Sequence, residues 1–255
     1  LGDVYKRQVK FCIEEHLMEL KNNKPTWRDL TLIPIGFVLI FLFTFLETLI
    51  AANFNVPMTV ETLIPISAIG QINTYIALLI IYYYFHYSEM SMKLSSGWHY
   101  VKKHWLFLLI MLLIAMGGET LYNYLVSFLP ENLQYTETQN EQELELLFRN
   151  PAFLPFTFIF VVIIGPVVEE LFFRTILIGE LGKKLNYIVM AIISVIGFAL
   201  IHVTGAESPF EIGSYLIMAI VIVYVYFKSG KNTAATIAIH IANNFVSFII
   251  TILYL

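Results

Sequence analysis

Two adjacent carboxylates lie inside an apolar stretch that reads GPVVEELFFR over residues 165–174. A charged side chain at the centre of a membrane costs about 2.5–3.5 kcal/mol on insertion scales, so each such group needs a partner. Glu170 and Arg174 are four residues apart and share one face of a helix, where they can pair. Glu169 is rotated by about 100° on a helix of 3.6 residues per turn. We therefore expect Arg174 to neutralise Glu170 and Glu169 to remain available for chemistry.

Two later apolar stretches also carry polar groups at helical spacing. In GFALIHVT, Phe198 and His202 are four residues apart; in AIHIANNFVS, His240 and Asn244 are four apart and Asn243 is beside them. Two imidazoles that meet a carboxylate in a dry pocket can ligate zinc or activate a water molecule directly. Histidine and asparagine can also donate hydrogen bonds to a developing oxyanion.

Each of these groups also has a structural interpretation. The Glu170–Arg174 pair can serve stability alone, even beside a catalytic centre. His202 can bond a neighbouring backbone carbonyl, and the asparagines of the last stretch can join helices. Phe198 is expected to pack in the core or to form a wall of a pocket. The chemical interpretation therefore depends on whether three separate segments converge.

The composition indicates a membrane protein. The chain has 255 residues, of which 58% are hydrophobic and 13% charged, whereas a soluble domain is about half apolar and about a quarter charged. The net charge of −4 gives no reason to expect a nucleic-acid partner. A single cysteine excludes an internal disulfide framework and a cysteine-rich metal site.

The positioning elements are predicted to be helices, because a helix needs about 20 mostly apolar residues to cross the hydrocarbon core. The expected fold is an all-α polytopic membrane bundle of about seven transmembrane helices. The candidate spans are residues 30–52, 67–87, 105–129, 153–180, 187–203, 212–228 and 233–255. Thr26 and Asp29 before the first span resemble a capping box, and His86, His99 and His104 are expected to be ordinary interfacial residues.

Charges in the connections alternate at every crossing. One set of connections is basic, and in the opposite set only Arg149 is basic. This asymmetry predicts a cytoplasmic N-terminus and an outside C-terminus. The short loops favour a prokaryotic cell membrane. The basic residues on the expected cytoplasmic side are Lys10, Lys21, Lys24, Arg28, Lys93, Lys102, Lys103, Lys183, Lys184, Lys228 and Lys231.

Four regions follow from these patterns. Residues 1–29 are expected to form a cytoplasmic segment, whose opening LGDVYKRQ has the character of an assembly artefact or a truncated start. Residues 30–129 form a three-helix membrane part, and 130–150 an acidic extracytoplasmic loop in which ELELLF can make a short interfacial helix. Residues 151–255 form a four-helix part that carries the unusual polar groups.

The order EExxxR, FxxxH and HxxxN on successive membrane helices resembles the CPBP intramembrane proteases. These include the CAAX-prenyl endopeptidases and the bacteriocin-processing and immunity relatives, also called the Abi family. The resemblance covers roughly residues 150–255, whereas residues 1–130 match only as generic membrane helices. EExxxR alone is a weak signal, but three motifs in this order are specific together. The matching residues are Glu169, Glu170, Arg174, Phe198, His202, His240 and Asn244.

The resemblance implies proteolysis at a membrane-embedded site. By motif, Glu169 would be the general base that activates water, and His202 would assist or hold that water. His240 and Asn244 would stabilise the tetrahedral oxyanion. The expected partners are membrane lipid and a peptide or lipidated protein substrate.

The remaining motif residues are assigned supporting roles by the same resemblance. Glu170 and Arg174 would orient the site, whereas Phe173, Phe198 and Asn243 would line the substrate pocket.

The cofactor stays open between zinc and none. The family is often labelled metalloprotease, and a metal-free glutamate mechanism has also been argued for it. If zinc is bound, its ligands are expected to be Glu169, His202 and His240. The sequence lacks HExxH, in which one helix supplies two histidines and a base.

The predicted spans leave one geometric difficulty. At 1.5 Å per residue, His240 lies about 10 Å from the cytosolic edge and His202 about 22 Å, with Glu169 between them. Helix tilt, or a fifth span that begins earlier in the cytosol, must bring them level if they form one site.

Two other functions compete with proteolysis. Buried Glu, His and Arg are the usual parts of proton relays, so a proton-coupled transporter is one alternative. No inverted repeat of the kind that many transporters show is evident, and the polar residues cluster in one half. The other alternative is a non-catalytic immunity scaffold.

Overall fold

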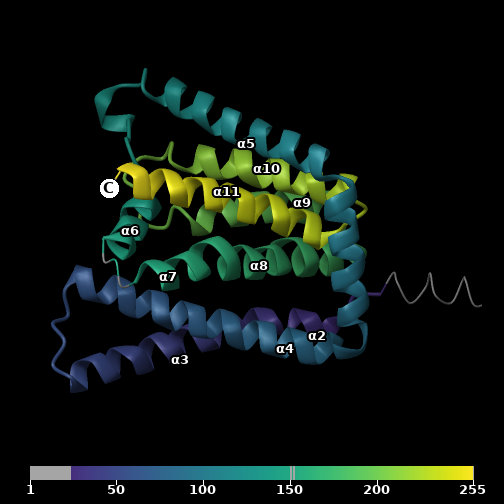
Figure 1. The fold of residues 1–255 in the computed structure, drawn as a ribbon, viewed down its shortest axis with the longest axis horizontal. Helices are drawn as coiled ribbons and strands as arrows, with labels where there is room; N and C mark the ends of the chain where they lie inside the picture. The colour runs from purple at the N-terminus through teal and green to yellow at the C-terminus, as the bar shows by residue number, and fades with distance from the viewer. Residues whose placement is uncertain (1–23, 150, 152, 255) are drawn as a thin grey trace, which may run out of the picture.

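The computed structural model describes residues 24–149, 151 and 153–254, and within them it forms helices and no strand, which confirms the all-α prediction (Figure 1). The opening LGDVYKRQ and most of the predicted segment 1–29 lie outside the described residues. In chain order the elements are α2 (Trp27–Leu30), α3 (Leu32–Asn53), α4 (Val60–Lys103), α5 (Trp105–Val126), η1 (Glu131–Leu133), α6 (Gln139–Phe148), α7 (Leu154–Thr157), η2 (Phe158–Ile164), α8 (Gly165–Glu170), η3 (Leu171–Glu180), η4 (Leu181–Lys183), α9 (Tyr187–Ile201), α10 (Ile212–Lys228) and α11 (Thr233–Tyr254).

Most of these helices have the length and composition of membrane spans. In the described part of the chain, five helical segments are long and apolar enough to cross a membrane. The other two predicted stretches form the shorter apolar helices α9 and α10, of 15 and 17 residues. The chain is therefore an integral, multi-pass membrane bundle. The five long segments are Trp27–Asn53, Val60–Lys103, Trp105–Val126, Leu154–Lys183 and Thr233–Leu253.

The bundle has two distinct ends (Figure 1). At one end lie α2, the α4–α5 connection, η4 and the α10–α11 turn. At the other end lie α6, the loop between α9 and α10, and the C-terminus. Helices of the bundle run alternately from one end to the other, as the charge pattern of the connections predicts.

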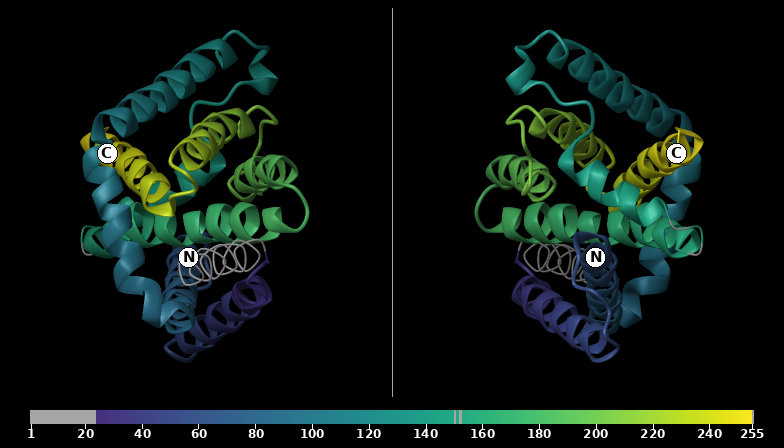
Figure 2. Two further views of the ribbon diagram at one scale, coloured as in Figure 1. Left: turned by 90° about the vertical axis from the view of Figure 1, so that its right-hand side faces the viewer. Right: turned by 90° about the vertical axis from the view of Figure 1, so that its left-hand side faces the viewer.

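Helix α4 is longer than the predicted span at 67–87, because it continues past a kink at His86. That residue has non-helical dihedral angles (φ −117°, ψ 15°). Beyond it, the second half of the helix crosses one end of the bundle at its periphery (Figures 1 and 2). Gly97 permits this crossing, since a Cβ there would lie 2.6 Å from the Cβ of Ala234 in α11.

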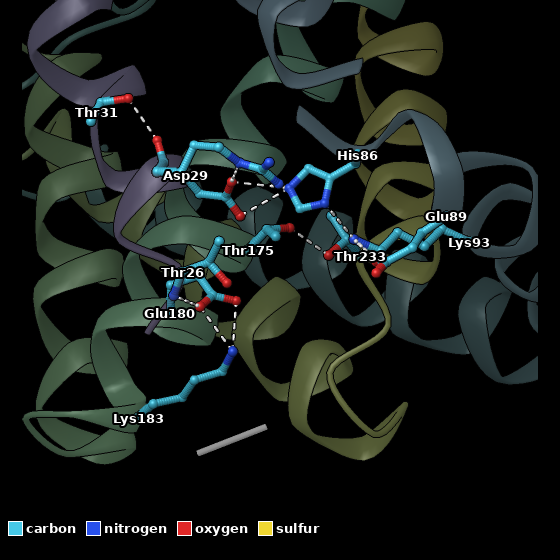
Figure 3. A network of polar contacts seen from close by, with 11 residues as sticks. Thr26, Asp29, Thr31, His86, Glu89, Lys93, Thr175, Glu180, Lys183 and Thr233 are labelled. Carbon is cyan, nitrogen blue, oxygen red and sulfur yellow. Dashed lines mark hydrogen bonds and ion pairs between the residues drawn. The ribbon is translucent and has the colours of Figure 1, made fainter. Parts of the chain in front are cut away.

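A buried polar cluster holds the kink (Figure 3). His86 Nε2 lies 3.0 Å from each carboxylate oxygen of Asp29, and its Nδ1 lies 3.0 Å from Lys93 Nζ. Asp29 is 2% and His86 8% exposed, so the expectation of an ordinary interfacial position is wrong for His86. The capping-box expectation is also wrong: the Thr26 side chain makes no cap bond, and its backbone N–H donates instead to Glu180 in η3.

Helices α3 and α4 form a closely packed antiparallel pair. A Cβ on Gly70 would lie 2.9 Å from the Thr44 Cα, so only glycine permits this approach. Asn73 Nδ2 donates to Glu47 Oε1 across the pair at 3.0 Å. The carboxylate of Glu47 is thus engaged by an amide of the neighbouring helix. The outer face of α3 is apolar and exposed, as a lipid-facing helix requires.

Candidate active site

Glu170 and Arg174 form an ion pair on successive turns of α8 and η3. Arg174 Nε lies 3.1 Å from Glu170 Oε2, and both side chains are 0% exposed. The Nε–H is not aligned as a hydrogen bond, since within the described residues Glu170 Oε2 and Arg174 Nε have no hydrogen-bond partner. Arg174 Nη1 donates to Ser194 Oγ of α9 at 2.8 Å, and Ser194 Oγ donates to the Phe173 carbonyl at 3.1 Å. The arginine therefore fixes η3 against α9.

His240 of α11 lies between the two carboxylates. Its Nδ1 is 3.0 Å from Glu170 Oε1, and its Nε2 is 3.7 Å from Glu169 Oε2. Because a carboxylate paired with Arg174 is an acceptor, the short contact assigns the Nδ1 proton to His240. In the neutral imidazole, Nε2 then directs its lone pair at Glu169.

His202 approaches Glu169 from the end of α9. It is the C-cap residue of that helix, and its Nδ1 donates to the Phe198 carbonyl at 2.7 Å. Its Nε2 lies 4.0 Å from Glu169 Oε2. The structural interpretation, a histidine bonded to a backbone carbonyl, therefore holds for one ring nitrogen, while the other faces the carboxylate.

The depth difficulty is resolved by where α11 begins. The hydroxyls of Thr175 and Thr233 lie 2.6 Å apart, so α11 enters the bundle beside the middle of η3. The two segments are antiparallel (Figure 1). Glu169 lies six residues before Thr175, and His240 lies seven residues after Thr233. The two side chains therefore lie at about the same depth in the bundle. Helix α11 thus begins deeper in the bundle than expected when every span is measured from one cytosolic edge.

Phe198 and Phe173 pack behind the two histidines. Their rings meet edge to face at 5.5 Å, and they are 2% and 6% exposed. The Phe198 ring lies 4.6 Å from that of His202 and 5.6 Å from that of His240. The guanidinium of Arg174 is 5.0 Å from the same ring. Both phenylalanines therefore form an apolar backing to the polar groups rather than an exposed lining.

Asn244 donates a hydrogen bond to the backbone of segment η2. The helical turns of segment η2 are widened, so that the Gly165 N–H donates to the carbonyl five residues earlier, that of Phe160. By the same pattern the Val161 carbonyl would pair with residue 166, which is proline and has no N–H. Asn244 Nδ2 donates to this carbonyl at 3.0 Å. This bond uses one of the two amide hydrogens of Asn244. The neighbouring Asn243 is half-buried.

The predicted metal ligands do not form a metal centre as they are placed. One carboxylate oxygen and two imidazole nitrogens are ligand types that zinc takes. Among residues 24–149, 151 and 153–254, however, no group of three or more His, Cys, Asp or Glu side chains could hold a metal ion.

Sequence reasoning missed two residues near the site. Ser194 precedes Phe198 by one helical turn and so shares its face, a spacing that could have indicated a partner for Arg174. Tyr215 of α10 stacks on the His202 ring, with centroids 4.8 Å apart and 23° between the planes. Nothing in the local pattern of α10 distinguishes this tyrosine, because its partner is set by the tertiary fold.

Comparison with known proteins bears on the same region. Residues 151–246 match the family model described as Rce1-like, type II CAAX prenyl endopeptidase. No curated protein and no solved structure matches the chain significantly. The matched range contains all three motifs, from Glu169 to Asn244. This match confirms the resemblance of residues 151–246 to the CPBP family of proteases.

Proposed function

We propose that this protein is an intramembrane endopeptidase that hydrolyses a peptide bond in a membrane-associated or lipidated peptide or protein. The observation that carries the proposal is the position of the Glu169 carboxylate. Its Oε2 lies 3.7 Å from His240 Nε2 and 4.0 Å from His202 Nε2. Three helical segments that are far apart in sequence supply these atoms. The family match supports a protease but assigns no residue.

Glu169 is the general base in this proposal. Its side chain and that of His202 are 16% and 17% exposed, so neither group is fully enclosed by protein. Glu169 accepts a proton from a water molecule, whose oxygen forms a bond to the carbonyl carbon of the scissile peptide. When the C–N bond breaks, the same proton passes to the leaving amine. His202 Nε2 accepts a hydrogen bond from the water and so holds it near Glu169.

His240 and Asn244 stabilise the oxyanion. A protonated His240 keeps its Nδ1–H on Glu170 at 3.0 Å and gains an Nε2–H that can donate to the developing charge. Glu170 balances the positive imidazolium, which gives the Glu170–Arg174 pair a role beyond helix packing. Asn244 retains a second amide hydrogen for the same oxyanion, since only one is required by the Val161 carbonyl.

The test compares cleavage by wild-type protein and Glu169→Gln in proteoliposomes, with metal analysis of the same purified samples. Removal of a general base is expected to lower kcat by about 10²–10⁴-fold. Glu47→Gln is the matched control, because Glu47 is another carboxylate of a membrane helix and is held by Asn73. A folded Glu169→Gln protein that cleaves at the wild-type rate would contradict the assignment.

The alternatives give different outcomes in the same samples. Uptake of a solute that depends on Glu169, without cleavage, would indicate a proton-coupled transporter. A cellular phenotype that survives substitution of both Glu169 and His202 would indicate a scaffold.

We also propose that the lysine-rich end of the bundle is cytoplasmic and that the C-terminus is outside. The support is the alternation of charge between connections. In a background without Cys12, a cysteine at Lys184 is expected to be protected from a membrane-impermeant reagent in intact cells, and one at Glu143 is expected to react. The reverse pattern would overturn this orientation.

A further inference from the structure

The imidazole of His202 is held by rings from two helices. Phe198 of its own helix lies one turn earlier, with centroids 4.6 Å apart. Tyr215 of α10 stacks on it at 4.8 Å and 23°. His202 follows the last residue of α9, and its Nδ1 donates to the Phe198 carbonyl at 2.7 Å, so α9 holds one edge of the ring. The Tyr215 ring is thus a contact from outside α9 that fixes the plane of this imidazole.

The Tyr215 ring is in turn tied to the start of α6. Its hydroxyl lies 2.9 Å from Thr138 Oγ1. Thr138 Oγ1 donates to Glu141 Oε2 at 3.0 Å, so its oxygen is free to accept the tyrosine proton. Thr138 is 3% exposed and is the N-cap of α6. The link from Tyr215 therefore ends in a buried and fully bonded cap.

A second buried link joins the starts of α6 and α10. Gln139 N–H donates to Glu211 Oε2 at 2.8 Å. The other oxygen of Glu211 accepts from the backbone N–H groups of Glu207 and Ser208 at 2.9 and 3.0 Å. Glu211 is 1% exposed. Because one carboxylate bonds both helix starts, it holds α6 beside the first turn of α10, which carries Tyr215.

We propose that Tyr215 is a positioning residue for His202, and that the start of α6 sets the position of its ring through Thr138. The kinetic consequences rest on the proposed function, whereas the contact itself does not. Tyr215 acts through the imidazole, so its loss is expected to lower kcat and to leave KM within about two-fold. A misplacement of about 1 Å in a positioned group can cost about 10²-fold in rate.

The first test removes the ring. Tyr215→Leu is expected to lower kcat by about 10- to 100-fold. Tyr124→Leu is the matched control, because Tyr124 lies near the end of α5, is 61% exposed and packs edge to face on Phe128 at 5.0 Å. It is expected to change kcat by less than about three-fold. Wild-type kcat in Tyr215→Leu, or an equal loss in the control, would overturn the proposal.

The second test breaks the link and keeps the ring. Tyr215→Phe and Thr138→Val remove the same hydrogen bond, and each is expected to lower kcat by about two- to ten-fold. Thr138→Val also removes the α6 cap bonds, so it is expected to cost less in the Tyr215→Phe background than in wild type, where the shared hydrogen bond is still present. Additive losses, or none, would overturn the role of α6. These variants also serve if Tyr215→Leu does not fold.

A third readout needs no activity. In ¹⁵N-histidine-labelled protein, with the His202 signal assigned by His202→Gln, Tyr215→Leu is expected to shift the His202 ring resonances and Tyr124→Leu to leave them in place. An unchanged His202 signal in Tyr215→Leu rejects the positioning role. A shifted signal in a protein whose wild type shows no cleavage supports the contact and rejects the protease assignment instead, so the two failures are distinguishable.

Discussion

Two clusters in this protein combine a carboxylate, an imidazole and a cation, and they differ in what the imidazole has left to bond. In the kink cluster, both nitrogens of His86 are engaged, one by Asp29 and one by Lys93, each at 3.0 Å (Figure 3). In the candidate site, His240 engages Glu170 through Nδ1 at 3.0 Å and directs Nε2 at Glu169, 3.7 Å away.

This difference separates a structural cluster from a chemical one. A histidine bonded through both nitrogens must break a contact before it can exchange a proton. A histidine bonded through one nitrogen is oriented by that bond and keeps the other nitrogen for a water or an oxyanion. Burial and charge pairing alone therefore do not mark an active site, because both clusters have them.

The largest effect is expected from the imidazoles of the site. His202→Gln and His240→Gln should each lower kcat by about 10²–10⁴-fold, because each removes a group that handles the water or the oxyanion. The measurement is the rate of peptide cleavage at saturating substrate by protein of verified fold. Activity near wild type in either variant would remove that histidine from the mechanism.

The next effect is on stability. Arg174→Met leaves Glu170 buried without its cation, which is expected to destabilise the protein by about 3–5 kcal/mol. Thermal unfolding in detergent provides the measurement. Arg149→Met is the control, because Arg149 is 63% exposed and its pair with Glu145 should contribute less than about 1 kcal/mol. Equal losses in the two variants would show that burial of the pair is unimportant.

The kink cluster should respond in stability and not in chemistry. His86→Gln is expected to cost about 1–3 kcal/mol, because Asp29 and Lys93 lose a buried partner. Cleavage by the folded fraction should stay within about three-fold of wild type. A selective loss of kcat without a loss of stability would refute the distinction between the clusters.

The smallest effect concerns the backbone of η2. Asn244→Ala should cost about 1 kcal/mol in stability, because the Val161 carbonyl loses its donor. In a Pro166→Ala background, residue 166 can supply an N–H, so the same substitution should cost less. Unfolding of the four proteins measures this coupling. An unchanged cost in the alanine background would mean that proline is not the reason for the Asn244 bond.

The sequence predicted those features that depend on residues close together in the chain. The apolar stretches become the helices, and the spacing of Glu170 and Arg174 yields their ion pair. By contrast, the kink at His86 has no proline or glycine beside it in the sequence, and His86 contacts Asp29, more than 50 residues away. A tertiary contact of this kind leaves no signature in a single sequence.

The candidate site shows the same division. Three polar segments could be recognised, but their depths could not, because the position of α11 depends on the Thr175–Thr233 contact. The stacking of Tyr215 on His202 is likewise set by the loop and helix that precede α10. The role of Asn244 at the Val161 carbonyl depends on the widened turn before Pro166, which periodicity does not reveal.

The most direct test of the account compares one carboxylate from each cluster in a single cleavage assay. Glu169→Gln and Asp29→Asn make the same chemical change, from acid to amide, beside a buried histidine. The account predicts that the first abolishes cleavage to at most about one part in 10² of the wild-type rate, and that the folded second variant cleaves at a rate close to wild type. Retained cleavage in folded Glu169→Gln would contradict the central claim.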